Sequence, residues 1–473
     1  MSNLGPAIPR RIAVIGGGFS GLAAAHRLLE LAPAIQVTLF EAGDRLGGVV
    51  RTEEQEGFLI EHGADMFTTR EPWALDLCRR LGFVEELINT NSEHARAFVM
   101  RRGRLYPVPE GFTLMTPGRF WPLATSGLLS VAGKIRMAAE YFVPVRRDTS
   151  DESLASFVTR RLGREAYERL VQPLIGGIYT ADPTKLSMQA ALPMFLHMEQ
   201  QHGGLIRAVR NRRGQGPIEK SSGARYGLFA APRRGMESMV RAIAKRIPQG
   251  TVRLNASVQS LTQDAAGSWT VTESGSSQVE RFDAVLIATP AFHAADMLQI
   301  VSATLASELR AIPYASTAIV VLGYRRDQLK HALDGFGIVV PQTEGRRFLA
   351  VSLSSVKFAG RAPADRVLLR VFIGGACQPE LVDLADHELE QLAIRELEPL
   401  LGISGTPLRT RIIRWRNAMP QYQLGHLDRV ARIDQEVASL RNLALAGNAY
   451  RGVGIPFCIH SGEQAAEKLL SDL

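Results

Sequence analysis

The sequence predicts an α/β fold in which a parallel sheet with flanking helices is joined to a second, mixed or antiparallel sheet and to a helical insertion. Three observations predict it: a β-α-β pattern around a glycine-rich loop near the start, a mainly helical stretch from residue 111 to 215, and several β-rich runs between residues 316 and 373. The length of 473 residues is enough for two or three domains with large cores.

The first 41 residues carry the pattern of a Rossmann-type dinucleotide-binding unit. A β-rich run, Arg11–Ile15, leads into Gly16-x-Gly18-x-x-Gly21, and a helical pattern and a second β-rich run ending at Glu41 follow. In such a unit the first glycine permits a tight turn, the second lets the backbone approach a pyrophosphate, and the third allows helix and strand to pack closely. Glu41 stands where a carboxylate accepts hydrogen bonds from a ribose diol, which favours a dinucleotide without a 2′-phosphate.

The later elements follow along the chain. Residues 149–151 predict a helix start, and Gly235 precedes another helical pattern over residues 236–247. The chain closes with a strand at 443–446, a glycine-rich loop, and a helix over 458–470. Strands are predicted at 269–272 and 284–288, and the second sheet is predicted at 318–322, 337–340, 348–353 and 367–373.

These elements divide the chain into interleaved segments. The dinucleotide-binding domain is predicted from residues 1–65, 221–300 and 426–473. The second-sheet domain, which would hold the substrate, is predicted from residues 66–110 and 301–425. The helical domain, facing membrane or substrate, is predicted from residues 111–220.

Basic residues exceed acidic ones by eight over the whole chain, and the excess is concentrated in residues 101–220. That segment has 18 basic and 10 acidic side chains, which favours an anionic partner such as a membrane surface or a polycarboxylate ligand. Solvated surface charge explains the excess equally well. The segment also holds Phe120, Trp121, Leu128 and Leu129, so we predict peripheral contact with a membrane and no nucleic-acid partner.

Cysteine usage and the absence of export patterns predict the compartment. Cys78, Cys377 and Cys458 lie far apart without CxxC spacing, which argues against a disulfide framework and against a zinc site. The first residues lack a secretory signal pattern, and the longest uncharged stretches are shorter than the roughly 20 residues that a spanning helix needs. We therefore predict a cytoplasmic protein that meets the inner face of the membrane through its basic segment.

A second glycine pair, in Arg45-Leu46-Gly47-Gly48, favours FAD over NAD as the dinucleotide. Such a pair lets the chain pass close to the cofactor again, as in FAD-binding oxidoreductases that resemble amine oxidases, whereas NAD dehydrogenases usually lack it. Residues 57–65 are similar to the segment that runs beneath the flavin in that superfamily. His62 lies in this segment, and a histidine beside glycines is more often structural than a catalytic base. The helix that follows the C-terminal glycine-rich loop would aim its N-terminus at the flavin, where it stabilises negative charge on the reduced ring.

Several motifs, in the same order, resemble the protoporphyrinogen and coproporphyrinogen oxidase family over nearly the whole chain. They include QPLIGGIYTAD at 172–182, AMPQY at 418–422 and GVGIP at 452–456. The resemblance implies a flavoenzyme of late haem synthesis that removes hydrogens from a porphyrinogen macrocycle and passes the electrons to molecular oxygen.

The resemblance also implies which residues contact the cofactor and the substrate. Candidate substrate contacts are Ile178 and Tyr179, and no catalytic residue or metal ligand is assigned. The FAD contacts would come from both glycine-rich loops, the ends of several strands and the start of the last helix: Gly16, Gly17, Gly18, Phe19, Ser20, Gly21, Glu41, Ala42, Gly48, Val49, Gly63, Ala64, Asp65, Met66, Val258, Trp415, Val453, Gly454 and Ile455.

Two other functions fit the same fold class. A flavin amine oxidase or carotene desaturase is one, although residues 315–324 lack the lysine that amine oxidases usually place near the flavin. The other is a flavin-binding, membrane-associated adaptor without enzymatic activity, which the basic segment suggests.

The choice between the two porphyrinogens falls slightly to coproporphyrinogen III, with protoporphyrinogen IX as the alternative. Residues 454–456 look bacterial, and residues 111–113 lack an arginine that animal and plant members use nearby. Coproporphyrinogen III carries more propionates, and each offers a further charge-assisted contact. Glu71 argues the other way, because it places negative charge where Gram-positive-type members have a lysine.

Overall fold

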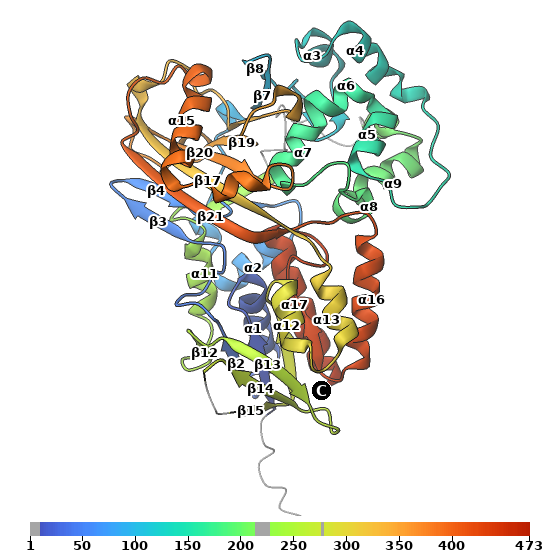
Figure 1. The fold of residues 1–473 in the computed structure, drawn as a ribbon, viewed down its shortest axis with the longest axis vertical. Coiled ribbons are helices and arrows are strands. Elements are labelled where there is room, and N and C mark those ends of the chain that lie inside the picture. The colour runs from blue at the N-terminus through green and yellow to red at the C-terminus, as the bar shows by residue number, and fades with distance from the viewer. Residues whose placement is uncertain (1–9, 213–227, 276–278) are drawn as a thin grey trace, which may run out of the picture.

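A computed structural model describes residues 10–212, 228–275 and 279–473 of the chain. Figure 1 shows a sheet with its helices at one end of the molecule, and a second sheet beside a helical region at the other end. This arrangement confirms the predicted fold class.

The first sheet is parallel and has five strands in the order β12-β2-β1-β16-β22. Its central strand β1 pairs with β2 on one side and with β16 on the other. The strands come from three distant parts of the chain: β1 (Arg11–Ile15), β2 (Gln36–Phe40), β12 (Val252–Arg253), β16 (Ala284–Ile287) and β22 (Leu443–Leu445).

Alternate residues of β1 face opposite sides of this sheet, as the period of a strand requires. Ile12 and Val14 lie in one core with the helices α1 (Phe19–Leu31), α2 (Trp73–Leu81), α11 (Glu237–Ala244) and α17 (Ile455–Asp472). Ala13 and Ile15 lie in another core, formed with α12 (Ala291–Leu298), α13 (Ala303–Arg310), α16 (His426–Ser439) and the small sheet of β13 (Val258–Gln263), β14 (Trp269–Glu273) and β15 (Val279–Phe282). Both faces are therefore covered, which explains why β1 is apolar throughout its last four residues.

The second sheet has seven strands in the order β21-β17-β20-β19-β18-β7-β8. It is mixed, because β18 and β7 pair in parallel whereas the other neighbours are antiparallel. The helix α15 (Asp386–Leu401) covers one face, and the hairpin of β3 (Thr52–Gln55) and β4 (Phe58–Glu61) covers part of the other. The strands are β7 (Ala97–Arg101), β8 (Arg104–Pro107), β17 (Tyr314–Arg325), β18 (Gly337–Val339), β19 (Ala350–Leu353), β20 (Arg366–Gly374) and β21 (Arg409–Pro420).

Short strands complete the two ends of the molecule. One small sheet joins β5 (Phe67–Thr68), β11 (Phe229–Pro232) and β6 (Leu87–Asn89), and another pairs β9 (Phe112–Thr113) with β10 (Thr116–Pro117). The helix α14 (Ser354–Lys357) connects β19 to β20.

The helical region packs on the second sheet, and its core includes Ala97 and Val99 of β7. Its helices are α3 (Phe120–Thr125), α4 (Val131–Ala138), α5 (Leu154–Leu162), α6 (Arg164–Ala166), α7 (Gln172–Tyr179), α8 (Met188–Ala191), α9 (Pro193–His202) and α10 (Leu205–Arg212). Among the described residues, no helix is long and apolar enough to cross a membrane.

Two expectations for this region are wrong. The predicted helix start at residues 149–151 is displaced, because α5 begins at Leu154 and its cap is Ser153, whose Oγ accepts a hydrogen bond from the Ser156 amide. Leu128 and Leu129, predicted at the membrane surface, are buried in the core instead. The predicted surface extends to residue 220, and its part beyond residue 212 lies outside the described residues.

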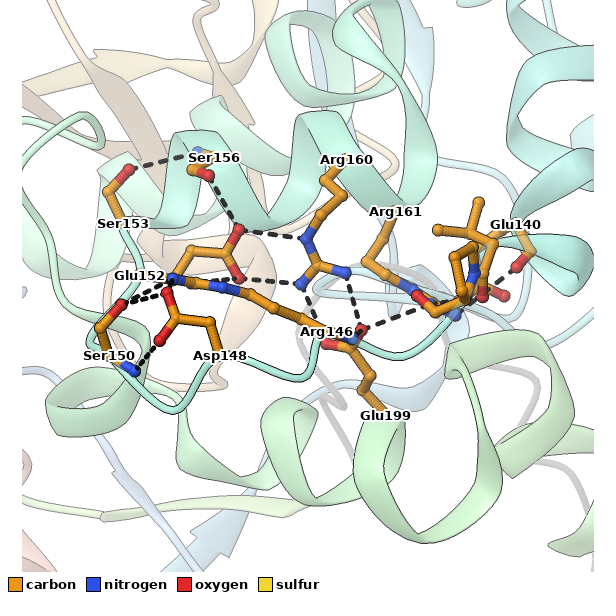
Figure 2. Close-up of polar contacts among 12 residues, drawn as sticks. Glu140, Arg146, Asp148, Ser150, Glu152, Ser153, Ser156, Arg160, Arg161 and Glu199 are labelled. Atoms are coloured by element: carbon orange, nitrogen blue, oxygen red, sulfur yellow. Dashed lines mark hydrogen bonds and ion pairs between the residues drawn. The ribbon is translucent and has the colours of Figure 1, made fainter.

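Buried ion pairs fasten the helical region together (Figure 2). Arg161 of α5 and Glu140, which follows α4, form an ion pair with no exposed surface on either side chain. Glu140 also accepts hydrogen bonds from two amides at the start of α10. Arg160 lies between Glu152 and Glu199, 2.8 and 2.7 Å from their carboxylates. These contacts connect four separate segments.

Candidate dinucleotide site

The glycine-rich loop between β1 and α1 has two glycines that the protein itself requires. Gly16 has a φ of +107°, and a Cβ there would lie 2.7 Å from the Ala288 carbonyl oxygen. A Cβ on Gly21 would lie 1.9 Å from the Gly16 oxygen. Side chains at these positions would clash with backbone, so the loop and the first turn of α1 pack as closely as the sequence predicts.

Gly18 differs from both, because a Cβ there would have no described atom within 4 Å. Its φ of −73° suits any residue, and it caps the start of α1. Packing within the protein therefore gives no reason for glycine here, whereas a ligand that approaches this backbone does. Phe19 and Ser20 form the first turn of α1 and are buried, and the backbone N–H groups of a first turn have no acceptor within their own helix.

Glu41 holds the loop from the end of β2. One carboxylate oxygen accepts a hydrogen bond from the Gly17 amide and the other from the Gly43 amide, each at 2.7 Å. A Cβ on Gly17 would lie 2.6 Å from Leu46 Cδ2 and 2.8 Å from Glu41 Oε2, so a side chain there would displace these groups. Ala42, next to Glu41, is exposed, so the strand end is open to a ligand. Val258 starts β13, two residues after Ala256, whose amide bonds to the Glu41 carbonyl.

The second glycine pair lies directly against the first loop. The Gly47 amide donates to the Gly17 carbonyl at 2.8 Å, and a Cβ on Gly48 would lie 3.5 Å from Gly18 Cα. Arg45 stabilises this turn by donating to the Gly48 and Val50 carbonyls. Val49 is 46% exposed, which is unusual for a valine between two packed segments. An exposed Val49 beside an open Gly18 indicates a surface that a ligand covers.

The segment from Gly63 to Met66 continues this surface. A Cβ on Gly63 would lie 2.5 Å from the Val49 carbonyl oxygen, so the two segments touch. Ala64 is exposed, and Asp65 and Met66 are partly exposed, although Phe67 after them is buried. Asp65 forms an ion pair with Lys357 at 2.8 Å.

Trp415 and His62 fix the backbone just before the Gly63–Met66 segment. The Trp415 indole Nε1 donates to the His62 carbonyl oxygen at 2.6 Å, which ties β21 to the residue before Gly63. The His62 ring is buried and its Nε2 lies 3.0 Å from Glu53 Oε2 on β3. Burial lowers the pKa of His62 despite this carboxylate. The ring is occupied by a contact within the hairpin, which is the structural role that the sequence favours.

The last helix brings a second N-terminus to the same edge of the sheet. Gly454 caps α17, Ile455 is its buried first residue, and Val453 packs against the core of the helical region. Because β1 and β22 are parallel, the helices that follow them both begin at the carboxyl edge of the sheet. The two helices are in close contact, since a Cβ on Gly462 would lie 2.1 Å from the Ser20 oxygen.

The predicted substrate contacts Ile178 and Tyr179 end α7, and the structure separates their roles. The Tyr179 hydroxyl donates to the Ala191 carbonyl at 2.9 Å, and burial raises its pKa to about 12. The tyrosine side chain therefore belongs to the helical core. Ile178 is 45% exposed and remains available to a ligand.

Sequence reasoning missed Lys357 at the end of α14 and Arg370 on β20, which contact Asp65 and Gly63. Neither residue belongs to a motif, and each lies hundreds of positions from its partner along the chain. The β-rich run over residues 367–373 predicts a strand around Arg370, but the sequence of a strand does not reveal the partner of a charged residue within it.

Comparisons with known proteins agree over the whole length of the chain. Residues 19–470 match the model of the flavin containing amine oxidoreductase family. The chain is 31% identical to Coproporphyrinogen III oxidase of Bacillus subtilis (strain 168), over 98% of both chains. It is 33% identical to Coproporphyrinogen III oxidase of Propionibacterium freudenreichii subsp. freudenreichii, over 97% of this chain and 90% of that one. A crystal structure from Exiguobacterium sp. 255-15, assigned provisionally as a protoporphyrinogen oxidase, superposes with a TM-score of 0.87 at 29% identity, over 98% of this chain and 100% of that one.

Proposed function

This chain belongs to the flavin containing amine oxidoreductase family, and we propose that within it the chain oxidises a porphyrinogen to the porphyrin with molecular oxygen as the electron acceptor. FAD is its cofactor, as the sequence predicts. Full-length similarity to coproporphyrinogen III oxidases carries the proposal.

The residues of the site fit FAD. Gly18 leaves open space at the start of α1, and the amides there suit a pyrophosphate. Both Glu41 oxygens bind loop amides, and each keeps a second lone pair for the hydroxyls of the adenosine ribose. We assign the cofactor-binding role to the residues of these loops, to Val258 and Trp415, and to the start of α17.

Bound FAD would supply the hydride acceptor and deliver the electrons to oxygen. The chain's own residues would bind and orient the cofactor and the porphyrinogen. The start of α17 offers free amides and positive partial charge at the edge of the sheet where the ligand lies. Ile178 at the end of α7 offers apolar surface to a macrocycle.

We propose coproporphyrinogen III as the preferred substrate. The names of the two bacterial relatives support this choice. The experiment is anaerobic mixing of the yellow protein with each porphyrinogen, followed by steady-state kcat/KM for both. Bleaching of the flavin by coproporphyrinogen III with the higher kcat/KM is expected. A preference for protoporphyrinogen IX would refute the substrate choice, and an unbleached flavin with both would refute the reaction.

The division of the chain into six segments forming three domains also remains a proposal. It is supported by the parallel sheet, whose strands come from residues 11–40, 252–287 and 443–445.

We further propose peripheral contact with an anionic membrane through the face of α3, α4 and the turn after them. Four apolar side chains there are largely exposed: Trp121 at 75%, Val131 at 73%, Ile135 at 65% and Phe142 at 79%. Lys134 ties the two helices together by donating to the Ala124 carbonyl at 2.6 Å. Exposed aromatic and aliphatic groups with basic neighbours suit the boundary between headgroups and acyl chains.

A further inference from the structure

Three buried cationic side chains lie next to the Gly63–Met66 segment of the candidate site. Lys357 ends α14, Arg370 lies on β20, and Arg361 lies between these two elements, and each is at most 5% exposed. The carboxylates that face them are Asp65 and Glu61. Ion pairs this deeply buried seldom stabilise a fold more than apolar residues of similar size would. Burial of these charges is therefore weak evidence that the cluster serves stability.

Two of these cations contact Asp65 directly. Lys357 Nζ lies 2.8 Å from Asp65 Oδ2, and an Arg370 nitrogen lies 3.3 Å from the same oxygen. Arg370 also donates to the Gly63 carbonyl, which fixes the backbone two residues earlier. Each carboxylate oxygen has more than one lone pair, so Asp65 can accept further hydrogen bonds. The side chain keeps 13% exposure, so part of it reaches the accessible surface.

The charges around Asp65 keep it ionised. Burial alone would raise the pKa of Asp65, but the charges of Lys357, Arg370 and the more distant Arg361 outweigh it and lower the pKa to about 2. Glu61 on β4 is bound to Thr52 and to the Met236 amide, and Arg361 donates to the Pro232 and Arg233 carbonyls. Glu61 and Arg361 thus form their hydrogen bonds with groups other than Asp65. Asp65 remains the carboxylate that Lys357 and Arg370 share.

A fixed carboxylate beside this site matches the chemistry of the proposed substrate. Porphyrinogens carry pyrrole N–H groups, which are hydrogen-bond donors. When a meso C–H bond breaks and its electron pair leaves with the hydrogen to FAD, the macrocycle gains a positive charge that is shared with a pyrrole nitrogen. The N–H proton then passes to water and restores neutrality. A carboxylate already in place binds the N–H donors and stabilises that charge.

We propose that Lys357 and Arg370 are positioning residues that hold Asp65 as a fixed, ionised acceptor for the pyrrole N–H groups of the porphyrinogen. The inference rests on the proposed function. It adds Lys357 of α14 and Arg370 of β20 to a site that the motifs place mainly in the glycine loops, and it gives Asp65 a role toward the substrate.

The test compares Lys357→Met, Lys357→Arg and Asp65→Asn with the wild type. Two quantities are measured for each holoenzyme: kcat/KM for coproporphyrinogen III across pH, and the reduction potential of the bound FAD. Arg161→Met is the matched control, because it also removes a buried cation, but from the helical region.

Loss of Lys357 should raise the pKa of Asp65. The kcat/KM of Lys357→Met relative to wild type should therefore fall as pH is lowered from about 8 to about 5, and Lys357→Arg should restore the wild-type profile. Asp65→Asn should lower kcat/KM roughly tenfold or more at every pH. The FAD potential should become more negative in Lys357→Met and more positive in Asp65→Asn, and a tenfold change in the relative affinity for the two redox forms corresponds to about 30 mV. Arg161→Met should change neither the profile nor the potential.

Unchanged pH profile and potential in Lys357→Met would overturn the inference. If Lys357→Met does not fold, Asp65→Asn decides, because it is isosteric and a wild-type kcat/KM in that variant would also overturn it. A wild type that oxidises neither porphyrinogen would instead refute the proposed function, while the potential shifts would still report the charge at Asp65.

Discussion

The Gly17 amide donates a hydrogen bond to the Glu41 carboxylate at 2.7 Å, so Glu41, which we propose as the ribose-binding residue, also shapes the glycine-rich loop. Glu41→Gln should weaken FAD binding, because an amide nitrogen would face one of two backbone N–H donors. Losing a hydrogen bond to a charged group costs about 1.5 to 3 kcal/mol, or roughly a tenfold to hundredfold rise in the FAD Kd. Titration of the apoprotein with FAD measures it. The exposed Asp44→Asn removes the same charge nearby, and an equal loss of affinity in that variant would contradict the assignment.

Gly18→Val should yield a folded but colourless protein. The backbone conformation of Gly18 accepts any residue and no described atom lies within 4 Å of its Cβ, so the fold tolerates the side chain, whereas a pyrophosphate would not. Circular dichroism of the purified protein tests whether it is folded, and its flavin absorbance tests whether it binds FAD. Gly21→Ala is the opposite control, since its Cβ would meet the Gly16 oxygen at 1.9 Å and should reduce stability. A yellow Gly18→Val protein would show that the dinucleotide lies elsewhere.

Arg161→Met should cost about 3 to 5 kcal/mol of unfolding free energy, because it leaves the fully buried Glu140 carboxylate without its counter-charge. Adding Glu140→Gln should recover part of the loss, since it removes the unpaired charge and its amide oxygen still accepts from one of the two α10 amides. Urea unfolding of both variants measures the difference. Equal stability of the single and double variants would mean that the unpaired charge is not the cause.

Stability should depend on pH through Glu61. Burial raises its pKa to about 7 from 4.5, so between these values the folded state holds a proton that the unfolded state has lost. The stability from this group is therefore complete below pH 4.5 and is lost as pH rises to about 7. As pH rises from 4.5 to about 7, the free energy of unfolding of Glu61→Gln should therefore increase by up to about 3 kcal/mol relative to that of the wild type. Unfolding curves for both proteins at several pH values provide the test, and a constant difference would contradict it.

Trp121→Glu and Ile135→Glu should each reduce binding to anionic lipid vesicles, since both place a charge on an exposed apolar face. Ile300→Glu is a matched control, because Ile300 is 74% exposed but follows α12 at the other end of the molecule (Figure 1). Vesicle co-sedimentation at low and high salt measures the binding. Equal losses in all three variants, or no binding by the wild type, would contradict the membrane contact.

Local patterns were sufficient where the chain is locally constrained. The Gly16 turn and the strand ending before Glu41 depend on residues close together in sequence, and both predictions are confirmed. The last helix is also confirmed, although α17 begins at Ile455, three residues before the predicted start at 458. The α5 start was misplaced by a few residues because several capping residues follow one another, and only packing selects Ser153.

Burial in the helical region could not be predicted from composition. Leu128 and Leu129 have the same apolar character as exposed Val131 and Ile135, and only the tertiary packing decides which pair faces the core. The Asp65 and Lys357 contact is a similar case, because it joins residues 292 positions apart.

The contact between α1 and α17 at Ser20 and Gly462 has a consequence for biosynthesis. During translation β1 and α1 are made before β22 and α17. Until β22 and α17 are made, the parallel sheet lacks its edge strand β22, and the candidate dinucleotide site lacks the N-terminus of α17. Nascent polypeptide should consequently be unable to retain FAD, and flavin loading should follow translation as a discrete maturation step, with unloaded intermediates exposed to chaperones and proteases in the meantime.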